Sequence, residues 1–420
     1  SGGGVAMPGM YERLRRELIV GGGEASEQPD PSGRSTAILS GLIIVGLLVW
    51  LGFSNPWTLV FVIGLLASIF LHEIGHFSTA RMTGMKVTQF FMGFGPRLYS
   101  RTKGEVEYGV RALPLGAFVR IVGMNALDEV EPGDEERAYR NKSFPRQLLV
   151  ITAGSMMHFI VALLLFVGVY STAGRYAQTG EVRVTFAPAA GSPAAAAGLA
   201  EGDIISSLGG VAVASRDELV RAITSHAPGD SVEIGLVRNG IDRTATAVLA
   251  QNPGDATVAF LGIATLSTGY VRQGVADAAG WAVRDSVSTI GNSVKGVVTA
   301  LNPFNSLRAL QHPNENLDTR PTTVVGASQI GGQLGRDEGL KAVLLLLASV
   351  NVFVGVFNLF PLLPFDGGHA AIAAYERIRS RNGTRYRADV NKMIPVTTIV
   401  IGLLGFLLFV GLYLDITNPL

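Results

Sequence analysis

The sequence predicts a polytopic α-helical membrane protein with about five spans, a membrane-associated β-hairpin region and an inserted α+β domain. The first observation is composition: the 420-residue chain is 48% hydrophobic and only 16% charged, whereas about 25% of the residues in a typical soluble domain are charged. The second is pattern, because long uncharged apolar segments alternate with polar regions rich in Gly, Pro, aromatic and β-branched residues. The apolar segments are long enough for membrane helices, and the interrupted regions are typical of short strands.

Charge and cysteine content exclude several classes of function. The formal net charge is only +1, which argues against a nucleic-acid-binding surface. The chain has no cysteine, so disulfides and thiolate zinc sites are excluded. Any metal must therefore be bound by His, Asp, Glu or water.

Five segments are apolar enough to be membrane spans. They are residues 37–53, 57–82, 148–170, 341–357 and 394–414. A Gly-, Ser- and Pro-rich tail, residues 1–36, precedes them and is expected to be flexible. The short loop 376–393 is rich in Arg, and basic short loops mark the cytoplasmic side. We therefore expect this loop and residues 81–147 in the cytoplasm, and residues 171–340 outside it.

An H-E-x-x-H pattern lies near the end of the second segment. His72 and His76 are four residues apart, which places both on one face of a helix. Two imidazoles in this arrangement can bind one metal ion, with Glu73 beside them as a proton acceptor. Residues 59–71 carry no charge, and ionisable groups within a membrane are costly and usually functional. The alternative is that the two histidines form a structural hydrogen-bonded pair.

A second motif, N-x-x-P-x-x-P-x-D-G-G, follows the fourth segment. Asp366 is the best candidate for a third metal ligand. Pro361 and Pro364 exclude a regular helix before it, and Gly367 and Gly368 allow a sharp turn after it. Irregular backbone at membrane depth is tolerated where it lines a cavity. The alternative is that Asp366 only caps the following helix.

Other polar residues of these segments have predicted roles near the metal. We expect Asn358, Pro361 and Pro364 to contact the substrate, with Asn358 bonding its backbone or the oxyanion. The alternative for Asn358 is a purely structural role. His369 is a candidate fourth ligand, although it directly follows the two glycines and is expected to begin a helix. His158, in the third segment, is expected to face a neighbouring helix.

The chemistry that these residues allow is peptide hydrolysis with Zn²⁺. A catalytic zinc keeps three protein ligands and one open position for water. Glu73 is suited to take a proton from the attacking water and to pass it to the leaving amine. A peptide bond in a membrane helix is shielded by the helix, so the substrate must unwind, and strands within residues 86–120 could pair with the unwound segment.

The region between the third and fourth spans has the pattern of a soluble domain. The spacing A-G-L-x-x-G-D-x-I-x-x-L-x-G begins at Ala197 and is followed by a predicted helix over 216–225 and a strand over 231–238. Residues 176–268 therefore resemble a bacterial-type PDZ domain, which would bind an extended peptide end or act only as a steric filter. Residues 269–300 predict an amphipathic helix, and residues 302–339 a polar connection.

These two motifs with a PDZ-like insertion resemble the site-2 protease family of intramembrane zinc metalloproteases, over about residues 57–414. The resemblance assigns zinc to His72, His76 and Asp366, and catalysis to Glu73. It implies a protease core made of two parts, the first of which contains a membrane-associated hairpin region. These regions comprise residues 57–170 with a cytoplasmic β-hairpin loop at 83–125, and residues 341–420.

The resemblance also implies a location and partners. A multi-pass protein of the cell membrane is expected, with the active site toward the cytoplasm and the PDZ-like domain outside it. The substrates implied are single-pass membrane proteins, often anti-sigma factors, already trimmed by a site-1-type protease. The family usually carries A-G-P-x-x-N before the PDZ domain, whereas residues 153–158 read A-G-S-M-M-H. The span at 37–53 is additional to the usual four.

Two other functions are compatible with the pattern. One is a catalytically silent membrane adaptor that holds partners through its PDZ-like domain, which an intact Glu73 disfavours. The other is a membrane zinc protease that attacks soluble or misfolded segments. The position of the cut relative to the bilayer distinguishes this second function from intramembrane cleavage.

Overall fold

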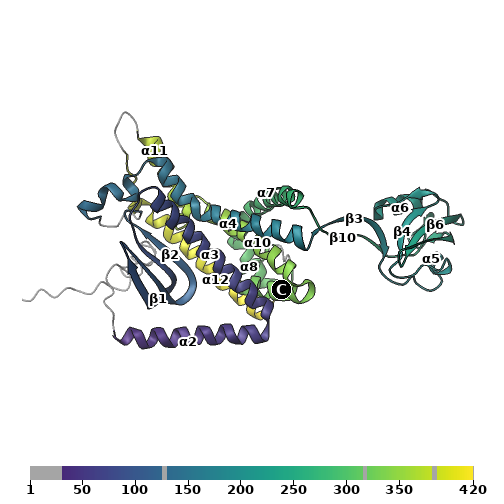
Figure 1. Cartoon of the computed structure of the whole chain (residues 1–420), viewed down its shortest axis with the longest axis horizontal. Helices are drawn as coiled ribbons and strands as arrows, with labels where there is room; N and C mark the ends of the chain where they lie inside the picture. Colours follow the sequence, from purple (N-terminus) through teal and green to yellow (C-terminus); the bar gives the residue numbers. More distant parts are fainter. Residues whose placement is uncertain (1–30, 125–129, 316–318, 381–385, 420) are drawn as a thin grey trace, which may run out of the picture. The chain divides into compact units, whose positions relative to one another are not determined.

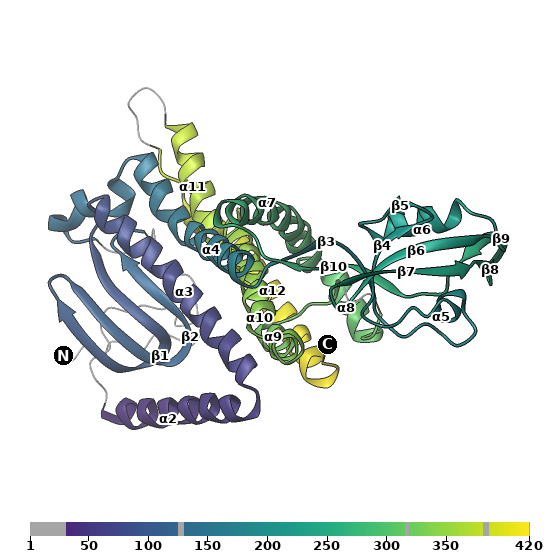
Figure 2. The same ribbon diagram turned by 45° about the vertical axis from the view of Figure 1, so that its right-hand side comes forward.

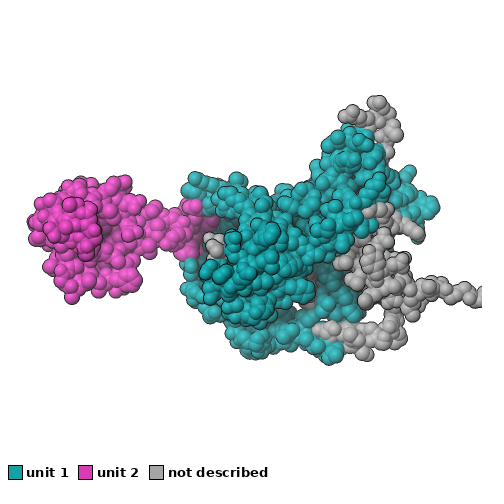
Figure 3. Space-filling view, turned by 180° about the vertical axis from the view of Figure 1, so that it is seen from behind, with its two compact units in different colours: residues 1–167, 279–420 teal, residues 168–278 magenta. Residues whose placement is uncertain are grey.

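The computed structural model describes residues 31–124, 130–315, 319–380 and 386–419. They form two compact units (Figure 3). Of the described residues, those up to Val167 and those from Ala279 onward form the membrane unit, and Gly168–Ala278 form the inserted unit.

Four helices of the described chain are long and apolar enough to cross a membrane (Figure 1). They are α3 (Pro56–Met82), α4 (Phe144–Thr172), α10 (Leu340–Asn358) and α12 (Ile394–Thr417). The predicted additional span lies in α2 (Pro31–Ser54), whose described apolar part is the shorter stretch Gly41–Ser54. Residues 31–36, part of the tail predicted to be flexible, form the start of this helix, which agrees with the preference of Pro31 for a first helical turn. Residues 1–30 of the predicted tail lie outside the described residues.

The start of α3 is set by local sequence. Asn55 caps the helix, because its side-chain oxygen accepts hydrogen bonds from the backbone N–H groups of Trp57 and Thr58 at 3.2 and 3.3 Å. Pro56 occupies the first turn, where a missing N–H costs nothing. From this start α3 runs without interruption to Met82, so His72 and His76 lie in its C-terminal half.

A curled sheet packs beside α3. Strands β1 (Val87–Lys103) and β2 (Val106–Ile121) are antiparallel and double back, so that Gln89 pairs with both Arg120 and Glu107. The sheet contacts both α2 and α3 (Figure 2). The sequence predicted shorter strands in this region, and the two long strands join them. The ring centroid of Phe90 lies 5.5 Å from that of Phe70 and 5.1 Å from that of Phe77. These contacts pack the sheet against the histidine-bearing part of α3.

The prediction of a polar connection over residues 302–339 was wrong, because two helices form there. They are α8 (Pro303–Gln311) and α9 (Val324–Glu338). Glycine lowers helix propensity, but the glycines of α9 allow it to pack closely on the start of α3. A Cβ added at any of three glycines would overlap a side chain of α3; the three pairs are Gly331 with Phe61, Gly332 with Thr58, and Gly335 with Trp57. Tertiary packing therefore overrides local propensity in this helix.

Asp415 joins α9 to the end of α12. Its side chain is fully buried, and Oδ2 accepts hydrogen bonds from Thr323 N, Thr323 Oγ1 and Gly326 N at 2.8, 2.7 and 3.0 Å. The other oxygen, Oδ1, lies 3.7 Å from a guanidinium nitrogen of Arg320, which is also buried. One carboxylate therefore satisfies the first turn of α9 and faces a buried cation.

The remaining helices of the membrane unit connect these elements. They are η1 (Pro132–Arg137) and η2 (Tyr139–Asn141) before α4, α7 (Val275–Ala300), α11 (Asp366–Arg379), and η4 (Val390–Met393) before α12. The predicted amphipathic helix was placed too early, since residues 269–271 belong to the strand β10 and α7 starts at Val275. Residues 381–385 of the predicted basic loop lie outside the described residues.

The inserted unit has the predicted α+β fold. Its main sheet has the order β10-β3-β4-β6-β7, with β5 paired to β4, and a second hairpin is formed by β8 and β9. The prediction of a helix and a strand near residues 216–238 is confirmed by α6 and β6. The elements are β3 (Arg175–Val184), α5 (Pro193–Ala196), β4 (Ile204–Leu208), β5 (Val211–Ala212), α6 (Arg216–Thr224), β6 (Ser231–Arg238), β7 (Ile241–Val248), β8 (Ala250–Asn252), β9 (Asp255–Phe260) and β10 (Thr265–Val271).

A buried ion pair explains the Asp of the G-D-x-I pattern in this unit. Asp203 is buried, and Arg238 donates to both of its carboxylate oxygens, from Nε at 2.7 Å and from Nη2 at 2.6 Å. The hydrogen bonds from Arg238 hold the pKa of the Asp203 carboxyl below its usual value. Such two-point pairing fixes geometry as well as charge, so Asp203 fastens the start of β4 to the end of β6.

Candidate metal centre

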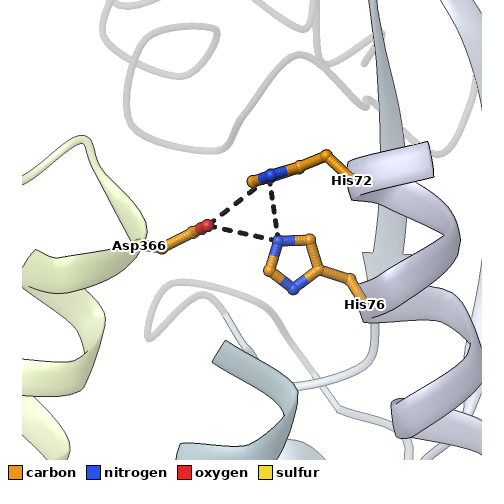
Figure 4. A group of neighbouring side chains, drawn as sticks. All are labelled: His72, His76 and Asp366. Carbon is orange, nitrogen blue, oxygen red and sulfur yellow. Dashed lines mark hydrogen bonds and ion pairs between the residues drawn. The ribbon is translucent and has the colours of Figure 1, made fainter. Parts of the chain in front are cut away.

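Three predicted metal ligands, from segments far apart in the chain, lie together (Figure 4). The Nε2 atoms of His72 and His76 are 3.1 Å apart. Asp366 Oδ2 lies 3.4 Å from Nε2 of His72 and 3.3 Å from Nε2 of His76. The side chains of both histidines are buried. The three atoms therefore form a nearly equilateral triangle that faces one point.

The size of this triangle fits zinc. Nitrogen and oxygen ligands lie about 2.0–2.1 Å from Zn²⁺, so two such ligands at a tetrahedral angle are separated by about 3.3 Å. The three measured separations, 3.1, 3.3 and 3.4 Å, agree with that value. Two nitrogens and one carboxylate oxygen are also a donor set that suits zinc in a cysteine-free chain.

The protonation of His76 also suits metal binding. Its Nδ1 lies 2.8 Å from the carbonyl oxygen of Val150 on α4. A carbonyl only accepts hydrogen bonds, so Nδ1 carries a proton, and in the neutral imidazole that binds a metal the lone pair is then on Nε2. A second hydrogen bond of this kind orients a metal-binding imidazole. The backbone of α4 therefore sets the direction in which Nε2 of His76 points.

Gly154 allows α4 to approach both imidazoles, a role that could not be predicted from the sequence. A Cβ added at Gly154 would lie 2.6 Å from His72 Nε2 and closer still to His76 Nε2. Only glycine leaves that space. The signal in the sequence was a glycine inside an apolar helix, which lowers helix stability and usually has a packing reason. That signal does not reveal which side chains occupy the space.

Gly154→Ala is expected to weaken metal binding about 10- to 100-fold, as changes next to ligands commonly do. The added methyl group would displace one of the two imidazoles from the triangle. The measurement is zinc affinity of the purified full chain, by competition with a chelator. Gly168→Ala, on the same helix, is the matched control, because nothing lies within 4 Å of its added Cβ. Equal zinc affinities for the two variants would contradict this account of Gly154.

Asp366 is delivered by a loop and a helix start. It is the first residue of α11, whose N-cap is Phe365, so Asp366 is not the cap itself. The positive end of the helix dipole favours a carboxylate in this first turn. The predicted reason for Gly367 and Gly368 was wrong, because neither has a positive φ. They are needed for close packing, since a Cβ at either position would overlap the backbone of residues 359–363.

Glu73 lies beside the triangle without belonging to it. Its Oε1 is 4.0 Å from His72 Nε2, and its carboxylate accepts a hydrogen bond from the backbone N–H of Val119 in β2. The converging ligand atoms among the described residues come only from the two histidines and Asp366. Glu73 is therefore placed to exchange protons next to a metal rather than to bind it.

The other predicted residues lie around this centre in different ways. Asn358 is the last residue of α10, and Pro361 and Pro364 lie in the exposed loop that leads to Asp366. His369 is in the first turn of α11 but outside the converging set. His158 faces a helix partner, as predicted, since its Nδ1 lies 2.8 Å from the side-chain oxygen of Asn351 on α10.

Comparison with known proteins identifies the family. Residues 60–404, most of the chain and both halves of the metal centre, match the model of peptidase family M50. The chain belongs to peptidase family M50. This is the site-2 protease family that the two motifs resemble. Helix α2 lies before the matched residues of this M50 peptidase.

Relatives over nearly the whole chain agree. The chain is 34% identical over 402 residues to the zinc metalloprotease Rip1 of Mycobacterium tuberculosis, covering 86% of this chain and 97% of that one. It is 27% identical over 352 residues to a putative zinc metalloprotease of Clostridium perfringens, covering 84% and 94%. Among solved structures, the PDZ domain of an SdrC-like protein from Listeria monocytogenes matches 21% of this chain and 92% of its own, with 25% identity and a TM-score of 0.19.

The M50 peptidase is thus a zinc metalloprotease of the site-2 type. Its four long apolar helices and its family indicate a multi-pass membrane protein with substrates in the membrane. The predicted enzyme class and cofactor are confirmed.

Proposed function

We propose that this peptidase cuts peptide bonds within the transmembrane segments of single-pass membrane proteins, with His72, His76 and Asp366 as the zinc ligands. The observation that supports this most is the triangle of ligand atoms, each side 3.1–3.4 Å long, between apolar helix α3 and the start of α11. Buried ionisable groups at membrane depth are costly and are retained for function.

The residues around the centre divide the chemistry. When zinc is bound, it polarises the scissile carbonyl and lowers the pKa of a water molecule to about 7. Glu73 accepts the proton of that water and returns it to the leaving amine, while Val119 N–H holds the carboxylate in place. Asn358, at the end of α10, is placed by the same backbone that leads to Asp366 and bonds the substrate backbone, beside Pro361 and Pro364.

The sheet offers the unwound substrate a partner. In the described part of the chain, residues 117–121 of β2 pair with β1 on one side only. No second strand of the described chain pairs with their other edge, and we place the added substrate strand there. Val119, in this segment, contacts Glu73, so a strand added there passes next to the catalytic carboxylate. Pairing to this edge holds the substrate extended, which exposes its peptide bonds to hydrolysis.

The proposed membrane topology limits which substrates can reach the active site. The basic residues between α11 and α12 face the cytoplasm, and the inserted unit lies outside it. There it excludes substrates with large outer domains, so those cut are single-pass proteins already trimmed by a site-1-type protease, anti-sigma factors among them. Peptide capture by the PDZ-like unit is the alternative role.

Cleavage of a reconstituted single-span substrate tests this proposal. The wild type is expected to cut within the span and to cut a trimmed substrate faster than one with a folded outer domain. Glu73→Gln should keep its zinc but lose roughly 10²- to 10⁴-fold in rate, the usual contribution of a general base. Equal cleavage by the two proteins would refute the mechanism. Substrate binding without cleavage would indicate an adaptor, and cuts outside the bilayer a protease of soluble segments.

A further inference from the structure

A chain of buried polar side chains links three membrane helices next to the metal centre. Ser68 of α3, Asn351 of α10 and His158 of α4 are 2%, 0% and 1% exposed. Asn351 Nδ2 donates to Ser68 Oγ at 3.0 Å, and Asn351 Oδ1 lies 2.8 Å from His158 Nδ1. None of these residues has a role in the hydrolysis proposed above, and polar groups are costly at this depth.

The hydrogen bonds that link His158, Asn351 and Ser68 have only one possible set of donors and acceptors. Asn351 Nδ2 also donates to the carbonyl oxygen of Leu347 at 2.8 Å, which fixes the orientation of the amide because a carbonyl only accepts. Oδ1 therefore faces His158, and Nδ1 of His158 must be the donor. Ser68 Oγ in turn donates to the carbonyl oxygen of Gly64 at 2.9 Å. Donation runs in one direction from His158 to α3, so the His158 ring cannot flip without breaking a bond.

The fixed ring lies against a metal ligand. The ring centroids of His158 and His72 are 5.0 Å apart, with the planes tilted by 44°. Ser68 is one turn before His72 on α3, and Gly154, which lies against both ligand imidazoles, is one turn before His158 on α4. The His72 imidazole therefore contacts the rings of both His76 and His158.

We propose that His158, held by Asn351 and Ser68, is a positioning residue that fixes the His72 imidazole in the orientation needed to bind zinc. It acts through ring packing and does not touch the reacting atoms. Since α10 also leads to Asp366, the same chain ties the histidine ligands to the element that delivers the carboxylate. This inference rests on the proposed assignment of His72 to zinc.

The test uses the full chain in detergent, stripped of metal and reloaded with Co²⁺, whose visible spectrum reports ligand geometry. His158→Leu and Asn351→Leu remove the same hydrogen bond from its two ends. Each is expected to change the Co²⁺ spectrum and to weaken zinc binding about 10- to 100-fold. The double variant should lose less than the sum of the two single losses, because the His158–Asn351 hydrogen bond is removed in both single variants. Ser68→Ala, a milder change, should shift the spectrum in the same direction.

Rescue and control variants separate positioning from general stability. His158→Asn keeps a side-chain donor to Asn351 but removes the ring, so it should restore the melting temperature without restoring zinc affinity or spectrum. Thr323→Val removes a hydrogen bond of a different network between helices and should lower the melting temperature without changing the spectrum. An unchanged spectrum and affinity in His158→Leu would overturn the inference, as would a His158→Asn variant with the zinc affinity and spectrum of the wild type.

His72→Ala distinguishes this outcome from failure of the proposed function. If His72→Ala leaves Co²⁺ and zinc binding intact, the assignment of the ligands is wrong and the inference falls with it. If His72→Ala abolishes binding while His158→Leu behaves as the wild type, only the positioning role is refuted.

Discussion

Asp366→Ala is expected to remove stoichiometric zinc from the protein and to lower cleavage of a membrane substrate roughly a thousandfold. The carboxylate is one of three atoms that define the ligand triangle, and it lies 3.3–3.4 Å from both imidazole nitrogens. Without it, two nitrogens from one helix remain, and catalytic zinc sites use three protein ligands. A bound zinc supplies several kcal/mol of transition-state stabilisation, and about 4 kcal/mol corresponds to a factor of a thousand. Zinc content and cleavage rate are measured on the same preparation.

His369→Asn is the matched control for Asp366→Ala. His369 lies in the same helical turn of α11 but outside the converging ligand atoms. The control variant is expected to keep zinc and activity. Retention of zinc by Asp366→Ala together with loss of zinc in His369→Asn would show that the third ligand was assigned to the wrong residue.

Asp415→Ala is expected to destabilise the membrane unit by about 3–5 kcal/mol, the usual effect of removing one partner of a buried pair. The Asp415 side chain is fully buried and accepts three hydrogen bonds from the start of α9. Its loss would leave two backbone N–H groups of α9 unsatisfied and the buried Arg320 without its carboxylate neighbour. The measurement is unfolding in detergent, together with hydrogen exchange of the α9 amides, which should become faster than those of α3.

Thr323→Val is a milder variant with which the loss of stability in Asp415→Ala can be compared. It removes one of the three donors and the N-cap acceptor for Val325 N–H, and leaves the carboxylate in place, so a loss of about 1–2 kcal/mol is expected. A loss from Asp415→Ala as small as that from Thr323→Val would mean that the carboxylate does not hold α9 in place.

The elements that could be predicted from the sequence depend on local chemistry. His72 and His76 are four residues apart, so they share one face of a helix wherever that helix packs. Hydropathy alone indicated the four long spans. Asp366 could be proposed because two prolines and two glycines around it mark irregular backbone. The approach of Asp366 to the histidines depends on how α3 and α11 pack, which only the structure provides.

The features that the sequence did not predict depend on contacts between helices. The fit of Gly154 under two imidazoles and the link from Ser68 through Asn351 to His158 require knowing which faces of three helices meet. Helix α9 was missed because its glycines indicate a loop when read locally. In the folded chain the same glycines allow close packing on α3, which outweighs their low helix propensity.

The proposed ligands come from opposite ends of the protease core. During synthesis, the first half of the core is inserted into the membrane with its pair of imidazoles long before the segment bearing the carboxylate leaves the ribosome. A nascent chain therefore has an incomplete centre until the inserted unit has been made and the last helices enter the bilayer. On the proposed ligand assignment, proteolytic activity therefore begins only after the last helices have been made.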